Sequence, residues 1–171
     1  SFEAAYDDDR VVAHIYLPKG VKPPYQTVIY YPGIDAFVTR SMDDYPYLEP
    51  ALFTRSGRAL VFPVYWGTFE RGGKPPDRHR SPLELGELIA RDFKDLARTI
   101  DYLETRPDVD ATRLGFYGLS LGANFGQIFG ALEPRLRVAI LVSYSPLRGC
   151  PSYDWFNFAP RMKTPTLVLN G

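Results

Sequence analysis

The sequence predicts an α/β fold with a mainly parallel sheet and helices on both faces, and three observations carry this prediction. Short, continuous apolar runs recur along the chain, and such runs are typical of strands buried on both faces of a parallel sheet. Segments with helical periodicity separate several of these runs. A Gly-x-Ser-x-Gly pattern at 118–122 stands between one run and one helical segment. Strands that alternate with helices indicate parallel strands joined by right-handed crossovers.

The first half of the chain predicts three strands and one helix. Apolar and other residues alternate over 11–17, which predicts a half-buried strand that ends at a Pro-Lys-Gly turn. Continuous apolar runs at 27–31 and 59–64 predict buried strands. Between them, a helical segment is expected over 47–56, closed by a glycine.

The second half predicts a long helix followed by further strands. Residues 81–84 combine an N-cap serine, a proline in the first turn and the glutamate of a capping box. Apolar residues then recur at helical spacing as far as Arg106, although Gly86 weakens the first turn and favours a slightly later start. The Pro-, Gly- and charge-rich stretch before this helix predicts a surface loop over 70–82. Three further strands are predicted at 113–117, 138–142 and 166–169.

Composition limits the class of protein and its partners. A chain of 171 residues that is 45% hydrophobic is expected to form one globular domain, 1–171. Twenty basic and twenty acidic residues without long runs argue against a nucleic-acid or anionic-membrane partner. No apolar stretch approaches the ~20 residues that span a bilayer. The single cysteine, Cys150, excludes an internal disulfide and fits a reducing, cytoplasmic compartment. Because Ser1 follows no methionine or signal pattern, we expect a domain boundary there.

The pattern at 118–122 is the strongest functional signal. A strand before it and a helix beginning near Ala123 give the context of a nucleophile elbow. Gly118 and Gly122 let the strand and the helix approach closely. Ser120 would then stand at the carboxyl end of the strand, with the Leu121 N–H facing the space in front of its hydroxyl. The alternative is a glycine-rich turn that only packs well.

This order of elements resembles the α/β-hydrolases, and the resemblance covers the chain from about Thr27 onward. It rests on the elbow, the Tyr-Pro-Gly-Ile loop at 31–34, the Pro-Asp-Val-Asp segment at 107–110 and the Thr-Pro-Thr strand start at 164–166. Within that superfamily the chain resembles the dienelactone-hydrolase and prolyl-oligopeptidase-like branch. More narrowly, it resembles hydrolase domains fused to bacterial Ser/Thr kinases, which implies a fused neighbouring domain.

The resemblance implies roles for individual residues. Ser120 would be the acyl-accepting nucleophile, and the Leu121 N–H would be one donor of the oxyanion hole. Ile34 matches the place of the second backbone donor. Many relatives have His-Gly in this loop, so Pro32 is a departure, but a backbone donor needs no particular side chain.

The base that a serine nucleophile needs is absent from its expected place. In this fold the triad follows the order Ser, then Asp or Glu, then His, and the acid comes after the strand expected at 166–169. The sequence stops at Gly171, so we expect the acid and the histidine beyond it. On this interpretation the chain lacks the last strand and helix of its fold and is inactive as a fragment.

Four residues within the chain are candidates to replace the missing base or acid, and none is favoured. His14 lies on an early strand and is expected at a sheet edge or facing solvent. His79 lies in a charged loop, where a surface role is favoured. Asp154 comes well after the strand at 138–142, so a structural or pocket-wall role is expected. Asp35, beside the oxyanion loop, is interpreted as a turn residue.

Aromatic residues after the strands are candidates for a substrate pocket, since loops at that edge often line one. Tyr65, Tyr144 and Trp155 are the candidates, with Trp66 beside the first. Each could equally cover the core, and both interpretations stay open. Cys150 does not occupy the elbow and is taken as an incidental thiol.

The leading hypothesis is a serine hydrolase that cleaves carboxylic esters of small-molecule substrates through an acyl-enzyme on Ser120. A non-catalytic binding or dimerisation module of a larger signalling protein is the second hypothesis. A peptidase of the prolyl-oligopeptidase kind is a further alternative, disfavoured because no gating domain is visible in the sequence. No metal-ligand cluster or phosphate-binding loop is present, so no cofactor is expected.

Overall fold

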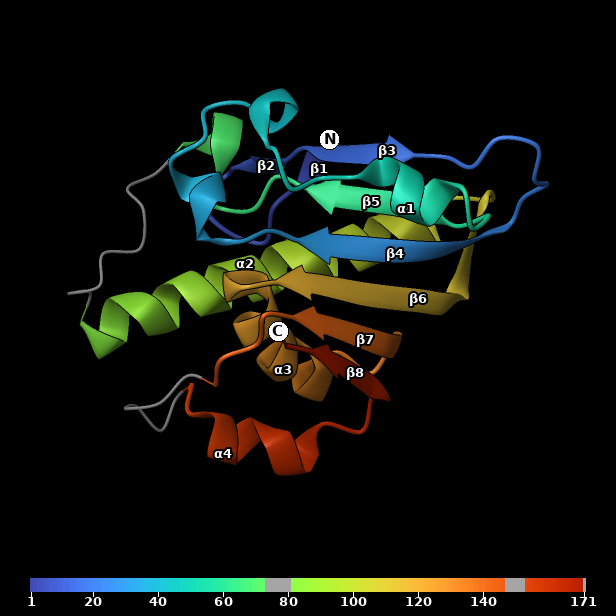
Figure 1. Ribbon diagram of the computed structural model, residues 1–171. Coiled ribbons are helices and arrows are strands. Elements are labelled where there is room, and N and C mark those ends of the chain that lie inside the picture. Colours follow the sequence, from blue (N-terminus) through green and yellow to red (C-terminus); the bar gives the residue numbers. More distant parts are fainter. Residues whose placement is uncertain (73–80, 147–152, 171) are drawn as a thin grey trace.

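The computed structural model describes residues 1–72, 81–146 and 153–170, which form a six-stranded sheet and a two-stranded hairpin (Figure 1). The order of strands in the larger sheet is β3-β5-β4-β6-β7-β8. Its strands are β3 (Ala13–Tyr16), β4 (Tyr25–Tyr31), β5 (Ala59–Pro63), β6 (Val109–Leu119), β7 (Leu136–Val142) and β8 (Thr166–Leu169). Only β3 is antiparallel to its neighbour, so the predicted mainly parallel sheet is confirmed.

Helices and short 3₁₀ turns connect these strands. The helices are α1 (Pro50–Thr54), α2 (Pro82–Glu104), α3 (Leu121–Leu132) and α4 (Trp155–Phe158). The 3₁₀ turns are η1 (Ile34–Phe37), η2 (Met42–Asp44), η3 (Phe69–Arg71) and η4 (Ala159–Arg161). Of the loop predicted over 70–82, the part at 73–80 lies outside the described residues.

The strand predicted over 11–17 is divided between two sheets. Its first part, β2 (Arg10–Val11), pairs with β1 (Phe2–Glu3) in the N-terminal hairpin. Its second part, β3, pairs with β5 at the edge of the main sheet. The change of partner falls at Val12, whose carbonyl accepts a hydrogen bond from the Val64 N–H at 2.8 Å.

Two helix boundaries differ from the prediction for local reasons. The helix expected over 47–56 spans only α1, because Pro50 takes its first turn and proline cannot continue a helix from the residues before it. Helix α2 begins at Pro82 without the delay expected from Gly86. The Ser81 side chain accepts the Glu84 N–H while the Glu84 carboxylate accepts the Ser81 N–H, so a complete capping box fixes the first turn.

Both long helices cover the same face of the sheet. Leu96 of α2 and Phe129 of α3 belong to one buried cluster with Ile29, Phe116 and Leu141 of the strands. On the opposite face, α1 and the segment before it cover β4 and β5 in a second cluster. The outer strands β7 and β8 expose several apolar side chains, among them Val138, Leu167 and Leu169.

Candidate active site

The elbow predicted at 118–122 is a strand, a one-residue turn and a helix. Strand β6 ends at Leu119 and α3 begins at Leu121, two residues earlier than expected. Ser120 lies between them with φ 53° and ψ −108°. A non-glycine residue with positive φ is uncommon and costs of order 1–3 kcal/mol, so the surrounding structure must impose this conformation. The Ser120 N–H is bound by the Val142 carbonyl of β7 at 2.8 Å.

The two glycines of the pattern are required by close backbone contacts. A Cβ atom added at Gly118 would collide with the carbonyl of Gly122. A Cβ atom added at Gly122 would collide with the carbonyl and side chain of Tyr31 in β4. Strand β6, helix α3 and strand β4 therefore contact one another directly through backbone atoms. The two glycines make this close approach, and with it the tight turn at Ser120, possible.

The loop after β4 lies next to Ser120. Tyr31 pairs with Gly118 in the parallel register, so the residues after Tyr31 run beside Ser120. The carbonyl of Pro32 accepts the Gly122 N–H at 3.1 Å. The point where a Cβ of Gly33 would stand is 3.6 Å from the Ser120 Cβ. The loop at 32–34 and the elbow are thus in direct contact.

Two backbone donors and one hydroxyl are unengaged beside this contact. Leu121 and Ile34 are the first residues of α3 and η1, where an N–H has no partner within the helix. Neither N–H makes another hydrogen bond within the described part of the chain, and neither does the Ser120 hydroxyl. These groups come from adjacent segments, as an oxyanion hole beside a serine nucleophile requires.

No histidine lies near Ser120 among the described residues. His14 is on β3 at the edge of the sheet, and β5 and β4 separate it from β6. Three strand spacings put His14 roughly 14 Å from the strand that carries Ser120. His79 lies outside the described residues.

The acidic candidates serve local structure. Asp35 is exposed in the first turn of η1, as expected of a turn residue. The Asp154 carboxylate accepts the Phe156 N–H at 3.1 Å, and its carbonyl accepts the Asn157 N–H at 3.0 Å. Asp154 therefore stabilises the start of α4.

The aromatic candidates for a pocket differ in their surroundings. Tyr65 is fully buried, and its ring lies tilted against that of Tyr31 with 4.2 Å between the ring centroids, so in this structure it is part of the core. Tyr144, two residues after the end of β7, is half-buried and donates its hydroxyl to Gln127 of α3. Trp155 begins α4, but its side chain, like Cys150, lies outside the described structure.

Sequence analysis did not identify two residues that hold the site's backbone. The Tyr45 hydroxyl accepts the Gly33 N–H at 2.9 Å, although nothing near residue 45 in the sequence points to that loop. Asn124, in the first turn of α3, accepts the Ser145 N–H at 2.8 Å on its side chain. Its position four residues after Ser120 is the only sequence signal that could have indicated it.

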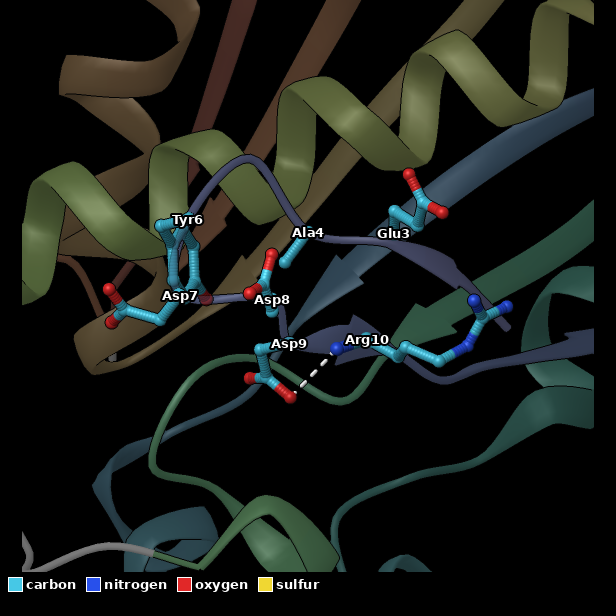
Figure 2. A pocket seen from close by; sticks show the side chains of 7 residues that line it. All are labelled: Glu3, Ala4, Tyr6, Asp7, Asp8, Asp9 and Arg10. Atoms are coloured by element: carbon cyan, nitrogen blue, oxygen red, sulfur yellow. Dashed lines mark hydrogen bonds between the residues drawn. The ribbon is translucent and has the colours of Figure 1, made fainter.

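A hollow of about 400 Å³ in the N-terminal hairpin is rich in acids but is not a second site (Figure 2). Asp7 pairs with Arg91, and Asp9 pairs with Arg71 at 2.6 Å. Among the described residues no group of three or more His, Cys, Asp or Glu side chains is placed to hold a metal ion. Within the same residues, no helix combines the length and apolar character that crossing a bilayer takes.

No family model and no curated protein matches this chain. Solved structures do match. A Klebsiella pneumoniae protein assigned as a dienelactone hydrolase has a TM-score of 0.68 and 22% identity, over 98% of this chain and 69% of its own. An acetyl xylan esterase from Paenibacillus sp. R4 has a TM-score of 0.70 and 20% identity, over 97% of this chain and 65% of its own. A cold-adapted esterase from an Arctic intertidal metagenomic library has a TM-score of 0.65 and 20% identity, over 99% and 69%.

These similarities define the class of fold. The chain has the α/β-hydrolase fold, with its mainly parallel sheet and helices on both faces. It spans about two thirds of the length of the three structures. At identities of 20–22%, the comparisons establish the fold only. The chemistry has to be argued from the residues of this chain.

Proposed function

We propose that this chain is the nucleophile-bearing part of a serine hydrolase that cleaves carboxylic esters. Ser120 attacks the ester carbonyl, the alcohol leaves, and water releases the acyl group from the Ser120 oxygen. The N–H groups of Leu121 and Ile34 stabilise the oxyanion of the tetrahedral intermediate. The observation that carries the proposal is the strained turn at Ser120, with a free hydroxyl beside two free N–H groups.

The base of this mechanism is proposed to lie beyond Gly171, where the acid and the histidine of a hydrolase triad would follow β8. Two observations support this. The Asp154 carboxylate is engaged at the start of α4, and His14 is separated from β6 by two strands. The matched hydrolases are longer than this chain. We therefore propose that the 171 residues alone hydrolyse esters at background rates.

Esters are favoured over peptides by the matched structures, two of which are named as esterases. The substrate is accordingly proposed to be a small-molecule ester. A peptidase of the prolyl-oligopeptidase kind would need an additional observation, such as cleavage after proline in a short peptide.

Hydrolysis of a chromogenic short-chain ester by the protein that the native gene encodes tests the proposal. Ser120→Ala is expected to lower kcat by at least about 10⁴-fold, because the nucleophile is lost. Ser145→Ala removes an exposed hydroxyl from the neighbouring loop and is the matched control, expected to stay within about twofold. Retained turnover in Ser120→Ala would remove Ser120 from the mechanism.

Replacing Ile34 with proline tests the second backbone donor. Proline deletes the N–H, and the site accepts it because Gly33 is already extended (φ −76°, ψ 178°) and Ile34 opens a helical turn. We expect kcat to fall by roughly 10²–10³-fold, the range for one oxyanion donor. Ile34→Ala keeps the N–H and should retain activity. Equal rates for the two variants would exclude this donor.

The second candidate function is a hydrolase-like module without catalysis. It is favoured by one observation, the lack of a histidine near Ser120 in the described residues. Reading the native gene beyond codon 171 separates the two candidates. A histidine and an acid there agree with the enzyme, and their absence agrees with the module.

A further inference from the structure

The loop at 32–34, which carries the Ile34 N–H, is bound by the phenol side chain of Tyr45. Gly33 is buried, and its N–H donates to the Tyr45 hydroxyl at 2.9 Å. The point where a Cβ of Gly33 would stand is 3.6 Å from that hydroxyl oxygen and also 3.6 Å from the Ser120 Cβ. Tyr45 therefore contacts the loop at the residue that adjoins the nucleophile, one peptide before the Ile34 N–H.

The Tyr45 side chain is itself firmly placed. It is only 5% exposed, and its ring packs edge-on against Phe69 at 5.3 Å and at 6.1 Å from the ring of Phe62. Burial raises the pKa of Tyr45, so its hydroxyl stays protonated and neutral at physiological pH. A neutral phenol oxygen can accept the Gly33 N–H without bringing a negative charge to a site that must stabilise one.

The segment that leads to Tyr45 is fixed by a carboxylate. Glu70, in η3, accepts the Ser41 hydroxyl at 3.1 Å and the Met42 N–H at 3.0 Å. These two bonds hold η2, which ends directly before Tyr45. The phenol is thus anchored by its ring on one side and by its own backbone on the other.

We propose that Tyr45 is a positioning residue of the hydrolase site, whose phenol oxygen holds the Gly33 peptide so that the following N–H, that of Ile34, faces the oxyanion in front of Ser120. The inference rests on the proposed function. Without the phenol, a buried N–H would lose its partner, and the loop would turn its peptides to recover a hydrogen bond. Glycine at 33 makes that rotation easy, because no side chain opposes it.

Tyr45→Phe in the protein that the native gene encodes tests the inference, with Tyr47→Phe as the matched control. Tyr47 belongs to the same segment and touches the Tyr45 ring, but it is 56% exposed and its hydroxyl makes no hydrogen bond among the described residues. We expect Tyr45→Phe to lower kcat by about tenfold with KM within about twofold, because only the transition state uses the donor. Tyr47→Phe should leave both constants unchanged.

A double-mutant cycle separates positioning from a general effect on structure. If Tyr45 acts through the Ile34 N–H, then Tyr45→Phe should cause no further loss of kcat once Ile34→Pro has removed that N–H. Losses that multiply in the double variant would overturn the inference. Amide exchange at Gly33 gives a readout without turnover, and it should become about tenfold faster in Tyr45→Phe alone.

The possible results distinguish a failure of this inference from a failure of the proposed function. A kcat unchanged in Tyr45→Phe, in an enzyme that is inactivated by Ser120→Ala, overturns the inference and leaves the hydrolase standing. Turnover that survives Ser120→Ala overturns the proposed function, and the inference with it. A Gly33 amide that exchanges at the same rate in Tyr45→Phe also contradicts the inference.

Discussion

The junction that carries Ser120 and the N-terminal hairpin are both bound to the sheet and its helices, but by opposite means. At the junction, backbone meets backbone, and Gly118 and Gly122 leave no room for a single added carbon. The hairpin is attached to α2 through charged and aromatic side chains, since Tyr6 donates to Asp95 and Asp7 pairs with Arg91. A region that must hold a strained turn relies on close packing, whereas a peripheral region relies on polar contacts that vary in strength with burial.

The hairpin contacts run from buried to exposed. Arg71 is 8% exposed and binds the buried carboxylate of Asp95 at 2.5 Å as well as Asp9 at 2.6 Å. The Tyr6 hydroxyl also donates to Asp95, at 2.7 Å. Farther out, Arg91 pairs with Asp7, which is 62% exposed. The comparison therefore predicts one large effect at the junction and a series of decreasing effects in the hairpin.

The largest effect is expected at Gly122. Gly122→Ala places a methyl group against the Tyr31 carbonyl, which is backbone and cannot move aside. We expect a loss of more than about 4 kcal/mol of unfolding free energy, or no folded protein. Gly130→Ala in the same helix is the control. Its methyl would meet only the flexible end of Met162, so its stability should change by less than about 1 kcal/mol. Similar losses in both variants would contradict the close-packing argument.

The next effect is expected at Arg71. Arg71→Met leaves Asp95, which has no exposed surface, without its cation. Burial raises the pKa of Asp95 and the Arg71 guanidinium opposes that rise, so removing Arg71 makes the charged carboxylate more costly. We expect urea unfolding to give a loss of about 3 kcal/mol. Arg98→Met, which breaks a half-exposed pair with Asp101, should stay within about 0.5 kcal/mol.

Asp9 is expected to make the attachment of the hairpin depend on pH. The Arg71 guanidinium holds the pKa of the Asp9 carboxyl below its ordinary value. A lowered pKa in the folded state means stabilisation that is complete above about pH 4 and is lost as the pH falls through the folded-state pKa. The stability difference between the wild type and Asp9→Asn should therefore vanish on acidification. A difference that grows toward low pH would contradict this sign.

The smallest effect is expected at Asp7. Asp7→Asn removes the exposed pair with Arg91 but suits the same backbone, because asparagine also tolerates the positive φ of 52° found there. The loss should be below about 1 kcal/mol and should shrink as salt is added. A loss as large as that of Arg71→Met would show that burial does not set the strength of these contacts.

The same comparison explains what the sequence could predict. The tight turn at Ser120 requires a glycine two positions before it and another two positions after it, so a short motif in the sequence indicates it. The strands at 27–31 and 59–64 were recognisable because most of their residues are buried and, apart from Thr27, apolar. The capping box at Ser81 is likewise local, and it outweighed the weak helix former Gly86.

Interactions between distant segments could not be predicted. Arg71 and Asp95 are 24 positions apart, and nothing in either neighbourhood indicates the pairing. Tyr45 reaches Gly33 across 12 positions from a segment without a regular pattern. The division of 11–17 between two sheets also depends on a partner, β1, that is only two residues long. Side-chain hydrogen bonds of this kind follow from the fold and leave no periodicity in the sequence.

Covalent labelling tests the central claim most directly. A fluorophosphonate ester reacts much faster with an activated serine than with an ordinary one, and the protein that the native gene encodes can be labelled, digested and analysed by mass spectrometry. The account predicts a single phosphonyl adduct on Ser120, formed before any on other serines. An active, labelled protein whose adduct lies on a different residue would contradict it.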